Sequence, residues 1–403
     1  MFDAWREVPP TAGLPLAARD FLPREANLEA AFARYLRLPE TQIECSGTAA
    51  LVVALTALAH GTLRRKVIIP AYTCPLVVLA IAHCGLQPIL CDLRIGSFDF
   101  DHNQLEQLCD VSILAIIPTH LGGRIAELAP VMEIAGRAGA MVIEDAAQAL
   151  GGYLQDKPVG SIGDIGFWSL AVGKGLTLYE GGVLYARDAA LRQRLRQARA
   201  ERVQHNAAWE LRRSLELIGY WAFYRPLGLR LAYGRPLRRA LRRGDFVAAV
   251  GDDFDAVIPL HRVSAWRRAV GVNALPRLAQ FQQNLTAQAV SRKQRLADIT
   301  GIQVLDDAPG AQGVWPFFML LLPTGRARDA ALAKLWTSSL GVSRLFIHAL
   351  PDYRYLAHLF ESPAVPHARD FAARMLTVSN SLWLDEVGFT RVLKALGDAV
   401  NQG

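Results

Sequence analysis

Lysine is scarce in this chain. Only six of its 44 basic residues are lysine, and arginine supplies the rest. Lys66, Lys157 and Lys293 each adjoin another charged residue, as surface lysines usually do. Lys174 has a glycine on either side and no charged residue within four positions. This lysine therefore stands out as a candidate for chemistry.

We expect neither cysteine pairing nor a leader segment from the sequence. The five cysteines are odd in number and contain no CxxC pair, which disfavours a zinc site and a disulfide framework. We therefore expect no metal. The first residues, MFDAWREVPP, lack the basic region and apolar core of a signal peptide. A cytoplasmic protein is the expectation.

One uncharged run is long enough to cross a membrane. Residues 67–91 carry no formal charge over 25 positions. The run is interrupted by Pro70, Pro75 and Pro88, and it also contains His83 and Gln87. Its pattern predicts a strand, a turn, a helix and a second strand. We therefore interpret it as part of a soluble fold.

Short apolar runs alternate with helical patterns through the first half of the chain. VIIP, PILC and ILAII are each followed by a helical stretch, and the apolar run MVIED comes next, before a Gly-rich stretch and shorter strands. This alternation predicts an α/β fold, with a mostly parallel sheet covered by helices on both faces. Ligands in such sheets bind at the carboxyl ends of the strands.

The pattern of the remaining residues predicts a second, smaller part of the protein. Residues 188–300 read as mostly helical, and residues 301–403 as an α+β unit with a strand pair near WPFFMLLLP and a closing helix. We expect a large domain over 1–250, which includes an arginine- and aromatic-rich helical segment at 205–245. A helical linker and a small C-terminal α+β domain follow over 251–403.

The setting of Lys174 suits a reactive amine. Apolar residues precede it in SLAVGKGLTLYEGG. A lysine that is removed from water has a lowered pKa and can form an imine with an aldehyde. This pattern predicts a covalent site for an aldehyde such as pyridoxal phosphate.

Asp145 ends the apolar run MVIED, where a parallel strand would deliver it to the ligand edge of the sheet. Acids at this place are often only helix caps. The alternative is that Asp145 holds the ring nitrogen of a pyridoxal cofactor in its protonated state. Gln148 could then reach the ring hydroxyl, and Glu144 would point to the other side of the strand.

A phosphate site is predicted at the start of the helix AALVVALTAL. Ser46, Gly47 and Thr48 precede it directly and could be no more than a helix cap. The same geometry offers free N–H groups and a helix dipole to an anion. Ser169, five residues before Lys174, adds a second hydroxyl group.

The order of these motifs resembles a known family. SGT, PAYT, THLGG, EDAAQALGG and GDIGFWSLAVGKGLTLYEGG follow one another as in the DegT/DnrJ/StrS family of sugar aminotransferases. That family has the aspartate-aminotransferase fold (type I). The resemblance covers most of the chain, is strongest over 43–187, and resumes at HRVSAWRRAVGVNALPRLAQF. The elements EDAAQA and SxxxxKxLxxxEGG at this spacing are specific.

The resemblance implies a role for each matching residue. Lys174 corresponds to the Schiff-base lysine and Asp145 to the acid on the pyridine nitrogen. Gln148 corresponds to the residue beside the ring hydroxyl. The phosphate-binding residues would be Gly47, Thr48 and Ser169. His120 matches the histidine of the family's H-L-x-G turn, although it could equally be a buried structural histidine.

Two positions depart from the family pattern. Directly after PxxT, where the family usually has an aromatic residue stacked on the cofactor, this chain has Cys74. Tyr72 is the nearest aromatic substitute. Where the family often has Asn-Tyr-Arg-Met-Ser, this chain reads LHRVS at 260–264, so that Arg262 aligns and the asparagine is missing. We therefore expect a divergent member of the family.

The resemblance implies a homodimeric transaminase that uses pyridoxal 5'-phosphate. Its acceptor would be a keto-sugar, nucleotide-linked, with glutamate as amino donor, in surface-polysaccharide or amino-sugar biosynthesis. Three alternatives remain: a sugar dehydratase of the same family, an enzyme acting on an amino acid or a lipid-linked substrate, and a non-catalytic regulatory protein. Dehydratases of this family have histidine in place of the lysine, so Lys174 disfavours the first alternative.

Positive charge is concentrated in one segment. Residues 212–243 contain nine arginines and a single acid, Glu216, together with five aromatic residues. Such composition fits peripheral contact with an anionic membrane. A surface hairpin or a dimer contact explains it as well. No nucleic-acid partner is expected.

Overall fold

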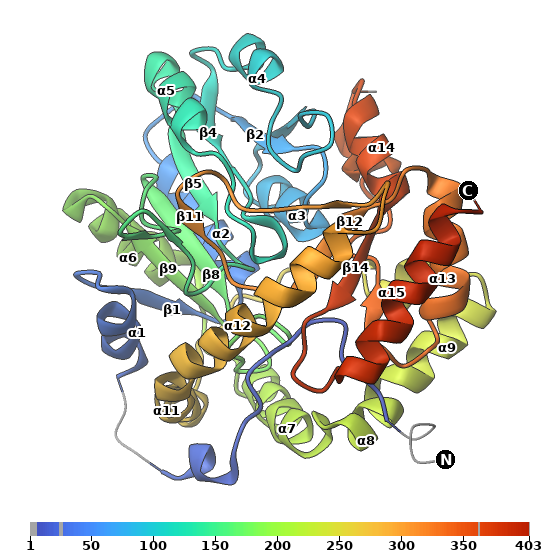
Figure 1. Ribbon diagram of the computed structural model, residues 1–403. Helices are drawn as coiled ribbons and strands as arrows, with labels where there is room; N and C mark the ends of the chain where they lie inside the picture. The colour runs from blue at the N-terminus through green and yellow to red at the C-terminus, as the bar shows by residue number, and fades with distance from the viewer. Residues whose placement is uncertain (1–5, 24–26, 362, 403) are drawn as a thin grey trace.

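The computed structural model describes residues 6–23, 27–361 and 363–402 (Figure 1). A seven-stranded sheet forms its centre, in the order β1-β9-β8-β5-β4-β2-β3. Its strands are β1 (Gln42–Glu44), β2 (Lys66–Pro70), β3 (Gln87–Cys91), β4 (Ile113–Ile116), β5 (Met141–Asp145), β8 (Ile165–Ser169) and β9 (Gly182–Ala186). The strands from β3 to β8 are parallel, whereas β9 pairs antiparallel with both of its neighbours, β8 and β1. The predicted mostly parallel sheet is confirmed.

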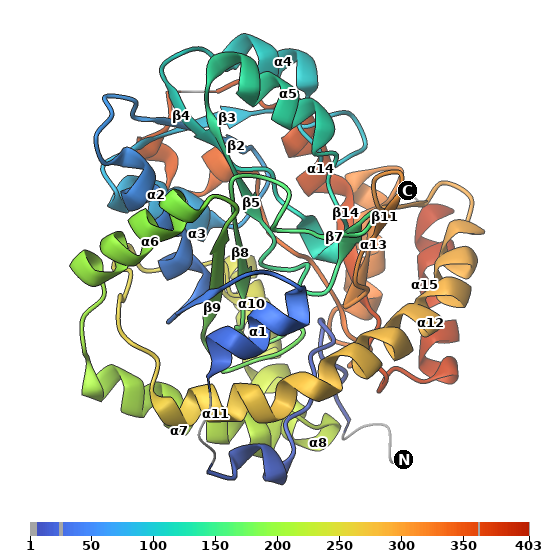
Figure 2. The ribbon, with the colours of Figure 1, turned by 90° about the vertical axis from the view of Figure 1, so that its left-hand side faces the viewer.

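Helices cover both faces of this sheet (Figures 1 and 2). They are α2 (Gly47–Ala59), α3 (Pro75–His83), α4 (His102–Leu108), α5 (Ala129–Ala138) and α6 (Ala189–Arg202). Side chains alternate between the faces along each strand. Ile68 and Ile116 pack with the apolar residues of α4 and α5, whereas Val67 and Ile69 pack with those of α2 and α3. Because both faces are buried, the strands are apolar throughout.

A second sheet lies in the C-terminal part. It is antiparallel, in the order β10-β12-β14-β13, and consists of β10 (Gln303–Val304), β12 (Phe317–Leu321), β13 (Val342–Ser343) and β14 (Met375–Ser379). Helices α13 (Gly325–Leu335), α14 (Pro366–Arg374) and α15 (Glu386–Val400) accompany it. The stretch WPFFMLLLP contains β12, which pairs antiparallel with β10, shortly before it in the chain, and also with β14, so a strand pair lies near this stretch as expected.

A small third sheet joins the two parts. Strand β11 (Ala311–Gln312) pairs with β6 (Tyr153–Leu154), which pairs with β7 (Lys157–Pro158). The long helix α12 (Leu278–Ala297) runs from α11 (Ala265–Ala274) toward the antiparallel sheet (Figure 1). A division of the chain at residue 250 stays a prediction.

The stretch between the two larger sheets is helical, as expected. It contains α7 (Ala207–Phe223), α8 (Pro226–Leu229), a π-helical turn (Arg230–Gly234), α9 (Arg235–Arg242) and α10 (Phe246–Val250). Elsewhere α1 (Leu28–Leu36) precedes β1, and short 3-10 turns occur at Ala18–Phe21, Leu121–Gly123, Leu275–Arg277, Leu350–Asp352 and Ala357–Leu359. Within the described ranges, no helix has the length and hydropathy that a membrane span requires.

The aromatic residues of the arginine-rich segment do not all face solvent. Tyr220 and Tyr224 are buried, and the Tyr224 hydroxyl accepts a hydrogen bond from the N–H of Gly13 at 2.9 Å. Trp221 packs against Phe21. The protein interior therefore buries Tyr220 and Tyr224 and partly covers Trp221, so Tyr220 and Tyr224 do not contribute to a membrane contact of this segment.

Candidate active site

A cavity of about 420 Å³ lies at the carboxyl ends of the parallel strands. Strands β2, β4, β5 and β8 end on this side of the sheet, where ligands of such folds bind. Seven of the nine residues expected at a cofactor site line this cavity: Gly47, Thr48, Cys74, Asp145, Gln148, Ser169 and Lys174. An adjoining cavity of about 130 Å³ also reaches Lys174 and Gln148.

Lys174 lies in the loop between β8 and β9. Gly173 and Gly175 have φ values of 79° and 78°, in the left-handed region that glycine tolerates best. The loop can therefore turn sharply on both sides of the lysine. Burial lowers the pKa of Lys174, although Cys74 and Asp145 act in the opposite direction. A lowered pKa leaves more of the amine uncharged, as a nucleophile requires.

Asp145 is held rigidly at the end of β5. Its backbone N–H donates to the carbonyl of Pro118, and its own carbonyl accepts from the N–H of His120, both at 2.9 Å. Its Oδ1 accepts from the N–H of Ala147 at 3.0 Å. Oδ2 has no hydrogen-bond partner in the described part of the chain, and burial raises the pKa of the carboxyl group. A buried carboxylate with a free oxygen on the cavity fits a cationic ring nitrogen.

Glu144 points to the other side of β5, as expected from strand alternation. Its carboxylate is fully buried and accepts hydrogen bonds from three backbone N–H groups, those of Gly160, Ile162 and Gly163. It also contacts Nε2 of His120 at 3.1 Å. These contacts stabilise the turn before β8. Glu144 therefore has a structural role.

His120 is buried away from the cavity. Its Nδ1 accepts a hydrogen bond from the N–H of Ala126 at 3.2 Å, so the ring proton lies on Nε2 and points to Glu144. Both ring nitrogens are thus occupied by the protein, and the residue does not line the cavity. Of the two alternatives for His120, the geometry supports the structural one, and the assignment to cofactor binding is corrected.

The amino end of α2 forms a cradle for an anion. The hydroxyl of Ser46 caps the helix by accepting from the N–H of Ala49 at 2.9 Å. The N–H groups of Gly47 and Thr48 have no acceptor among the described residues. A Cβ at position 47 would lie 3.1 Å from that of Ser169, so glycine allows this close approach. Free N–H groups at a helix start, next to hydroxyl groups, suit a phosphate.

Gln148 also faces the cavity. Its Oε1 accepts a hydrogen bond from the N–H of Gly122 at 2.7 Å, which fixes the side chain. Its amide nitrogen remains available to a ligand oxygen. This placement fits the role that the resemblance implies for Gln148.

Cys74 lies on the cavity at the start of α3, and burial raises the pKa of its thiol to about 12. Tyr72 does not take over the ring-stacking place. Its ring is buried against Phe346 and Phe371, and its hydroxyl exchanges hydrogen bonds with the backbone of Phe346 at 3.1 Å. The expectation that Tyr72 contacts the cofactor is wrong, because the side chain packs into the second part of the molecule.

The cavity is also lined by residues that the sequence motifs did not predict for it. Thr73 and Thr119 line it and share a hydrogen bond between their hydroxyl groups at 3.0 Å. Both lie in motifs that the family resemblance pointed to. Asp252, Phe254 and Arg344 come from later parts of the chain, and no local pattern distinguished them.

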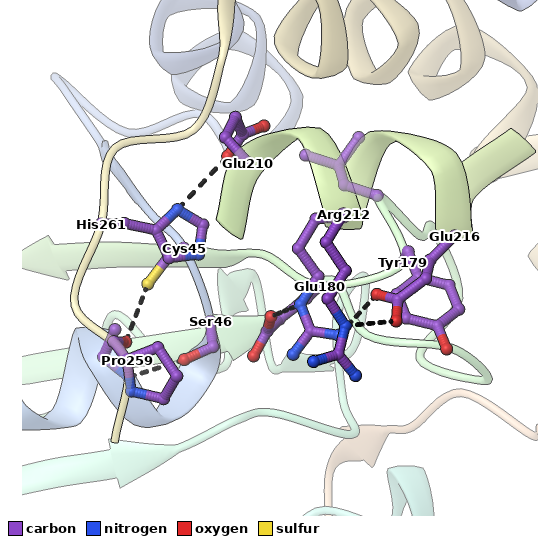
Figure 3. A network of polar contacts seen from close by, with 12 residues as sticks. Cys45, Ser46, Tyr179, Glu180, Glu210, Arg212, Glu216, Pro259 and His261 are labelled. Atoms are coloured by element: carbon purple, nitrogen blue, oxygen red, sulfur yellow. Dashed lines mark hydrogen bonds and ion pairs between the residues drawn. The ribbon is translucent and has the colours of Figure 1, made fainter. Parts of the chain in front are cut away.

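The second departure from the family pattern lies beside the phosphate cradle (Figure 3). His261 is buried, and its Nδ1 is 3.3 Å from Oε2 of Glu210. The thiol of Cys45, next to Ser46, donates to the carbonyl of Pro259 at 3.3 Å. The segment around 259–264 therefore packs against the cradle from within the same chain.

No group of His, Cys, Asp and Glu side chains in the described ranges could hold a metal ion. The donors in the cavity are an amine, a carboxylate with a free oxygen, an amide and helix N–H groups. Together they match the aldehyde, ring nitrogen, ring hydroxyl and phosphate of pyridoxal phosphate.

Solved structures share this fold. A putative sugar aminotransferase, Spr1654 from Streptococcus pneumoniae, aligns in its PLP form with a TM-score of 0.74, covering 98% of this chain and 99% of that chain at 18% identity. Helicobacter pylori PseC, an aminotransferase involved in pseudaminic acid biosynthesis, aligns with a TM-score of 0.72 over 97% of this chain and 93% of that chain at 15% identity. At these identities the likeness establishes the fold.

Relatives are also found by sequence. GDP-perosamine synthase of Caulobacter vibrioides is 34% identical over 180 residues, which are 45% of this chain and 48% of that protein. Thus the matched stretch spans about half of this relative. The dTDP-4-dehydro-2,3,6-trideoxy-D-glucose 4-aminotransferase of Saccharopolyspora spinosa is 23% identical over 94% of this chain and 89% of that protein. The family model matches residues 20–221 and 260–396. The chain therefore belongs to the DegT/DnrJ/EryC1/StrS aminotransferase family.

Proposed function

We propose that this protein is a pyridoxal-phosphate-dependent aminotransferase that passes an amino group to a keto-sugar. The observation that carries the proposal is the convergence of the Lys174 amine and the Asp145 carboxylate on one cavity. The phosphate cradle at the start of α2 lies on the same cavity. These three features would bind the aldehyde, the ring nitrogen and the phosphate of a single ligand.

The residues present fit the cofactor, and the family accords with its use. When bound, pyridoxal phosphate supplies an aldehyde that can carry the amino group and a cationic ring that stabilises negative charge on the reacting carbon. Lys174 would hold the aldehyde end, Asp145 the ring nitrogen and Gln148 the ring hydroxyl. Gly47, Thr48 and Ser169 would bind the phosphate.

The chain itself supplies the proton transfers. Once released, the amine of Lys174 can take a proton from the substrate carbon and return it to the cofactor carbon, as general base and then general acid. Its lowered pKa leaves more of the amine in the base form than in an ordinary lysine. The Asp145 carboxylate, which lines the cavity, would hold the ring nitrogen of the bound cofactor in its protonated state.

A nucleotide-linked keto-sugar is the proposed acceptor and glutamate the proposed donor. Support comes from the relatives, which are named for GDP-perosamine, for UDP-N-acetyl-3-dehydro-α-D-glucosamine and for a dTDP-linked trideoxy sugar. A spore-coat polysaccharide protein is also similar, at 30% identity over 174 residues. We accordingly place the reaction in surface-polysaccharide or amino-sugar biosynthesis.

Other activities have less support. A dehydratase of this family would have histidine at position 174, and this chain has lysine. A non-catalytic regulatory protein would not need Lys174 and Asp145 on a common cavity. An amino acid or a lipid-linked molecule in place of the keto-sugar is the alternative acceptor, which the presence of Cys74 in place of the usual aromatic residue leaves open.

We further propose a cytoplasmic homodimer with peripheral contact to an anionic membrane. Five arginines of the 212–243 segment are exposed and have no carboxylate partner among the described residues: Arg225, Arg235, Arg239, Arg242 and Arg243. Exposed apolar side chains accompany them: Leu215, Leu227 and Leu231. Exposed cations and apolar groups in one segment favour an anionic bilayer. A two-fold contact through this segment would bring like charges together.

The proposed reaction can be tested in two halves. Adding L-glutamate to the purified protein should shift the absorbance of the cofactor from the aldehyde to the amine form. A keto-sugar nucleotide should then restore the first spectrum and yield an amino-sugar by mass spectrometry. A protein that binds the cofactor but shows no spectral change with any amino donor would contradict the proposal.

A further inference from the structure

One stretch of the chain lies outside the family match and still reaches the active site. The family model leaves out residues 222–259, between its two matched ranges. Residues of this stretch line the cavity that holds Lys174 and Asp145: Tyr233, Val250, Gly251, Asp252 and Phe254. A wall of the active site is therefore built from a segment that the family model does not match.

Asp252 is the buried acid near the end of this stretch. It follows α10, and Gly251 ends that helix in the left-handed region with φ of 80°. Asp252 is 3% exposed. Its backbone carbonyl accepts a hydrogen bond from the hydroxyl of Tyr355 at 2.6 Å. These contacts hold Asp252 in one position.

The two carboxylate oxygens of Asp252 have different surroundings. Oδ2 accepts hydrogen bonds from the hydroxyl of Tyr353 at 2.6 Å and from the N–H of Ile347 at 2.8 Å. Oδ1 has no hydrogen-bond partner in the described part of the chain. Within the described ranges Oδ1 is not among the polar atoms that are sealed from solvent, so it can accept a hydrogen bond from a ligand in the cavity. The protein thus fixes one oxygen and leaves the other available to the cavity.

Asp252 also lies near the reacting groups. Burial raises the pKa of Cys74, and the charges of Lys174, Asp145 and Asp252 all act on the same thiol. Cys74 and these three charged residues line the same cavity. Val250 and Phe254 on the same wall are apolar, and Asp252 is the charged residue among them.

We propose that residues 222–259 select the acceptor, and that Oδ1 of Asp252 accepts a hydrogen bond from a hydroxyl or amide N–H group of the keto-sugar. This inference rests on the proposed aminotransferase function. A site that presents an unpaired acceptor atom to its ligand rejects analogues without the matching donor more strongly than an apolar wall can. Asp252 is then a specificity-determining residue, whereas Lys174 moves the proton.

The test uses Asp252→Asn with Asp253→Asn as matched control. In the first variant the side-chain oxygen can keep its contacts to Tyr353 and Ile347, so the amide nitrogen replaces Oδ1 and turns an acceptor into a donor. The neighbouring Asp253 is exposed, and its change removes the same charge without touching the cavity. A loss of activity in Asp252→Asn alone can therefore be attributed to lost recognition of the acceptor, and not to a lost structural contact or to the change in net charge.

Two acceptors differ in the groups they offer. UDP-N-acetyl-3-dehydro-α-D-glucosamine carries an amide and hydroxyl groups, whereas dTDP-4-dehydro-2,3,6-trideoxy-D-glucose lacks hydroxyls at three carbons. Asp252→Asn should lower kcat/KM for the first acceptor by about tenfold or more, since a hydrogen bond to a charged group is lost. The loss with the second acceptor should be at most about threefold, within the weak discrimination of apolar contacts. Asp253→Asn should match wild type with both acceptors, and all three proteins should take the amino group from glutamate at similar rates.

Each other outcome has a definite meaning. Equal losses with both acceptors, no loss at all, or wild-type activity confined to the trideoxy acceptor would overturn the role of Asp252. Wild type could accept only the first acceptor. In that case a lower kcat/KM in Asp252→Asn but not in Asp253→Asn supports the role of Asp252 in recognition, and an unchanged kcat/KM in Asp252→Asn overturns it. A wild-type protein that takes the amino group from glutamate but aminates neither acceptor would instead contradict the proposed acceptor class, and this inference with it.

Discussion

Arg267 and Glu210, 57 positions apart, form a bidentate ion pair beneath the loop that carries Lys174. Nε of Arg267 is 2.5 Å from Oε1 of Glu210, and Nη2 is 2.8 Å from Oε2. The remaining Nη1 donates to the carbonyls of Leu178 and Glu180, at 3.0 and 2.5 Å. Arg267 is fully buried. Helices α7 and α11 therefore hold the end of the catalytic loop through one guanidinium group.

The first prediction concerns this ion pair. Glu210→Gln should lower the free energy of unfolding by about 3–5 kcal/mol, because it leaves a buried guanidinium without its charge partner. Urea denaturation measures the change. The control is Glu133→Gln, which removes an exposed helical pair to Arg137 and should cost about 0.5 kcal/mol or less. Equal effects of the two variants would contradict a structural role for the buried pair.

The same ion pair predicts a pH dependence. Burial alone would raise the pKa of Glu210, but hydrogen bonds from Arg267 and His261 lower it well below its ordinary value of 4.5. Its contribution to stability is therefore fully present above that value and is lost as the pH falls below it. The difference in stability between wild type and Glu210→Gln should be constant near neutral pH and should shrink in acid. A difference that grew on acidification would contradict this linkage.

The second prediction identifies the lysine. Purified protein should be yellow, and borohydride reduction should attach the cofactor permanently to Lys174. The reason is its lowered pKa and its position on the cavity. Peptide mapping by mass spectrometry locates the label. A label on Lys157 or Lys293, or no label, would overturn the assignment of Lys174.

The third prediction concerns Asp145→Asn. A neutral amide cannot keep the ring nitrogen protonated, so transamination should fall by about a hundredfold or more, or about 3 kcal/mol of transition-state stabilisation. The fold should persist, because the backbone contacts of Asp145 do not depend on its charge. Steady-state rates measure the loss, and borohydride labelling of Lys174 shows that the cofactor is still attached. Near wild-type turnover would contradict the role of Asp145.

The fourth prediction tests membrane contact. Changing four exposed arginines to glutamine should reduce co-sedimentation with anionic vesicles, since each basic residue near such a surface contributes about 1 kcal/mol. The four are Arg235, Arg239, Arg242 and Arg243. Binding should also weaken with salt, because exposed charges are screened over about 10 Å at ordinary ionic strength.

A matched variant controls for net charge alone. It changes four exposed arginines outside the segment: Arg137, Arg187, Arg326 and Arg391. This variant should sediment like wild type with anionic vesicles. Recovery of every protein in the supernatant under all conditions would leave a dimer contact as the better explanation of the arginine-rich segment.

Much of the fold and the centre of the site could be predicted from the sequence, because local patterns determine them. Apolar runs such as MVIED must be buried on both faces, so they predict parallel strands and place Asp145 at the ligand edge. The glycines beside Lys174 predict a tight loop, and the hydroxyls before α2 predict a helix start. These signals depend on neighbours in sequence, and the structure places Lys174, Asp145 and Gly47 on one cavity.

Only the tertiary structure decided which side chains reach that cavity from a distance. Whether Tyr72 faces the ligand depends on Phe346 and Phe371, which pack on it from far along the chain. Asp252 gains its place through Tyr353 and Ile347, about a hundred positions away. Contacts between residues so far apart in the chain produce no periodic or local pattern in the sequence, because they depend on how the two sheets pack together.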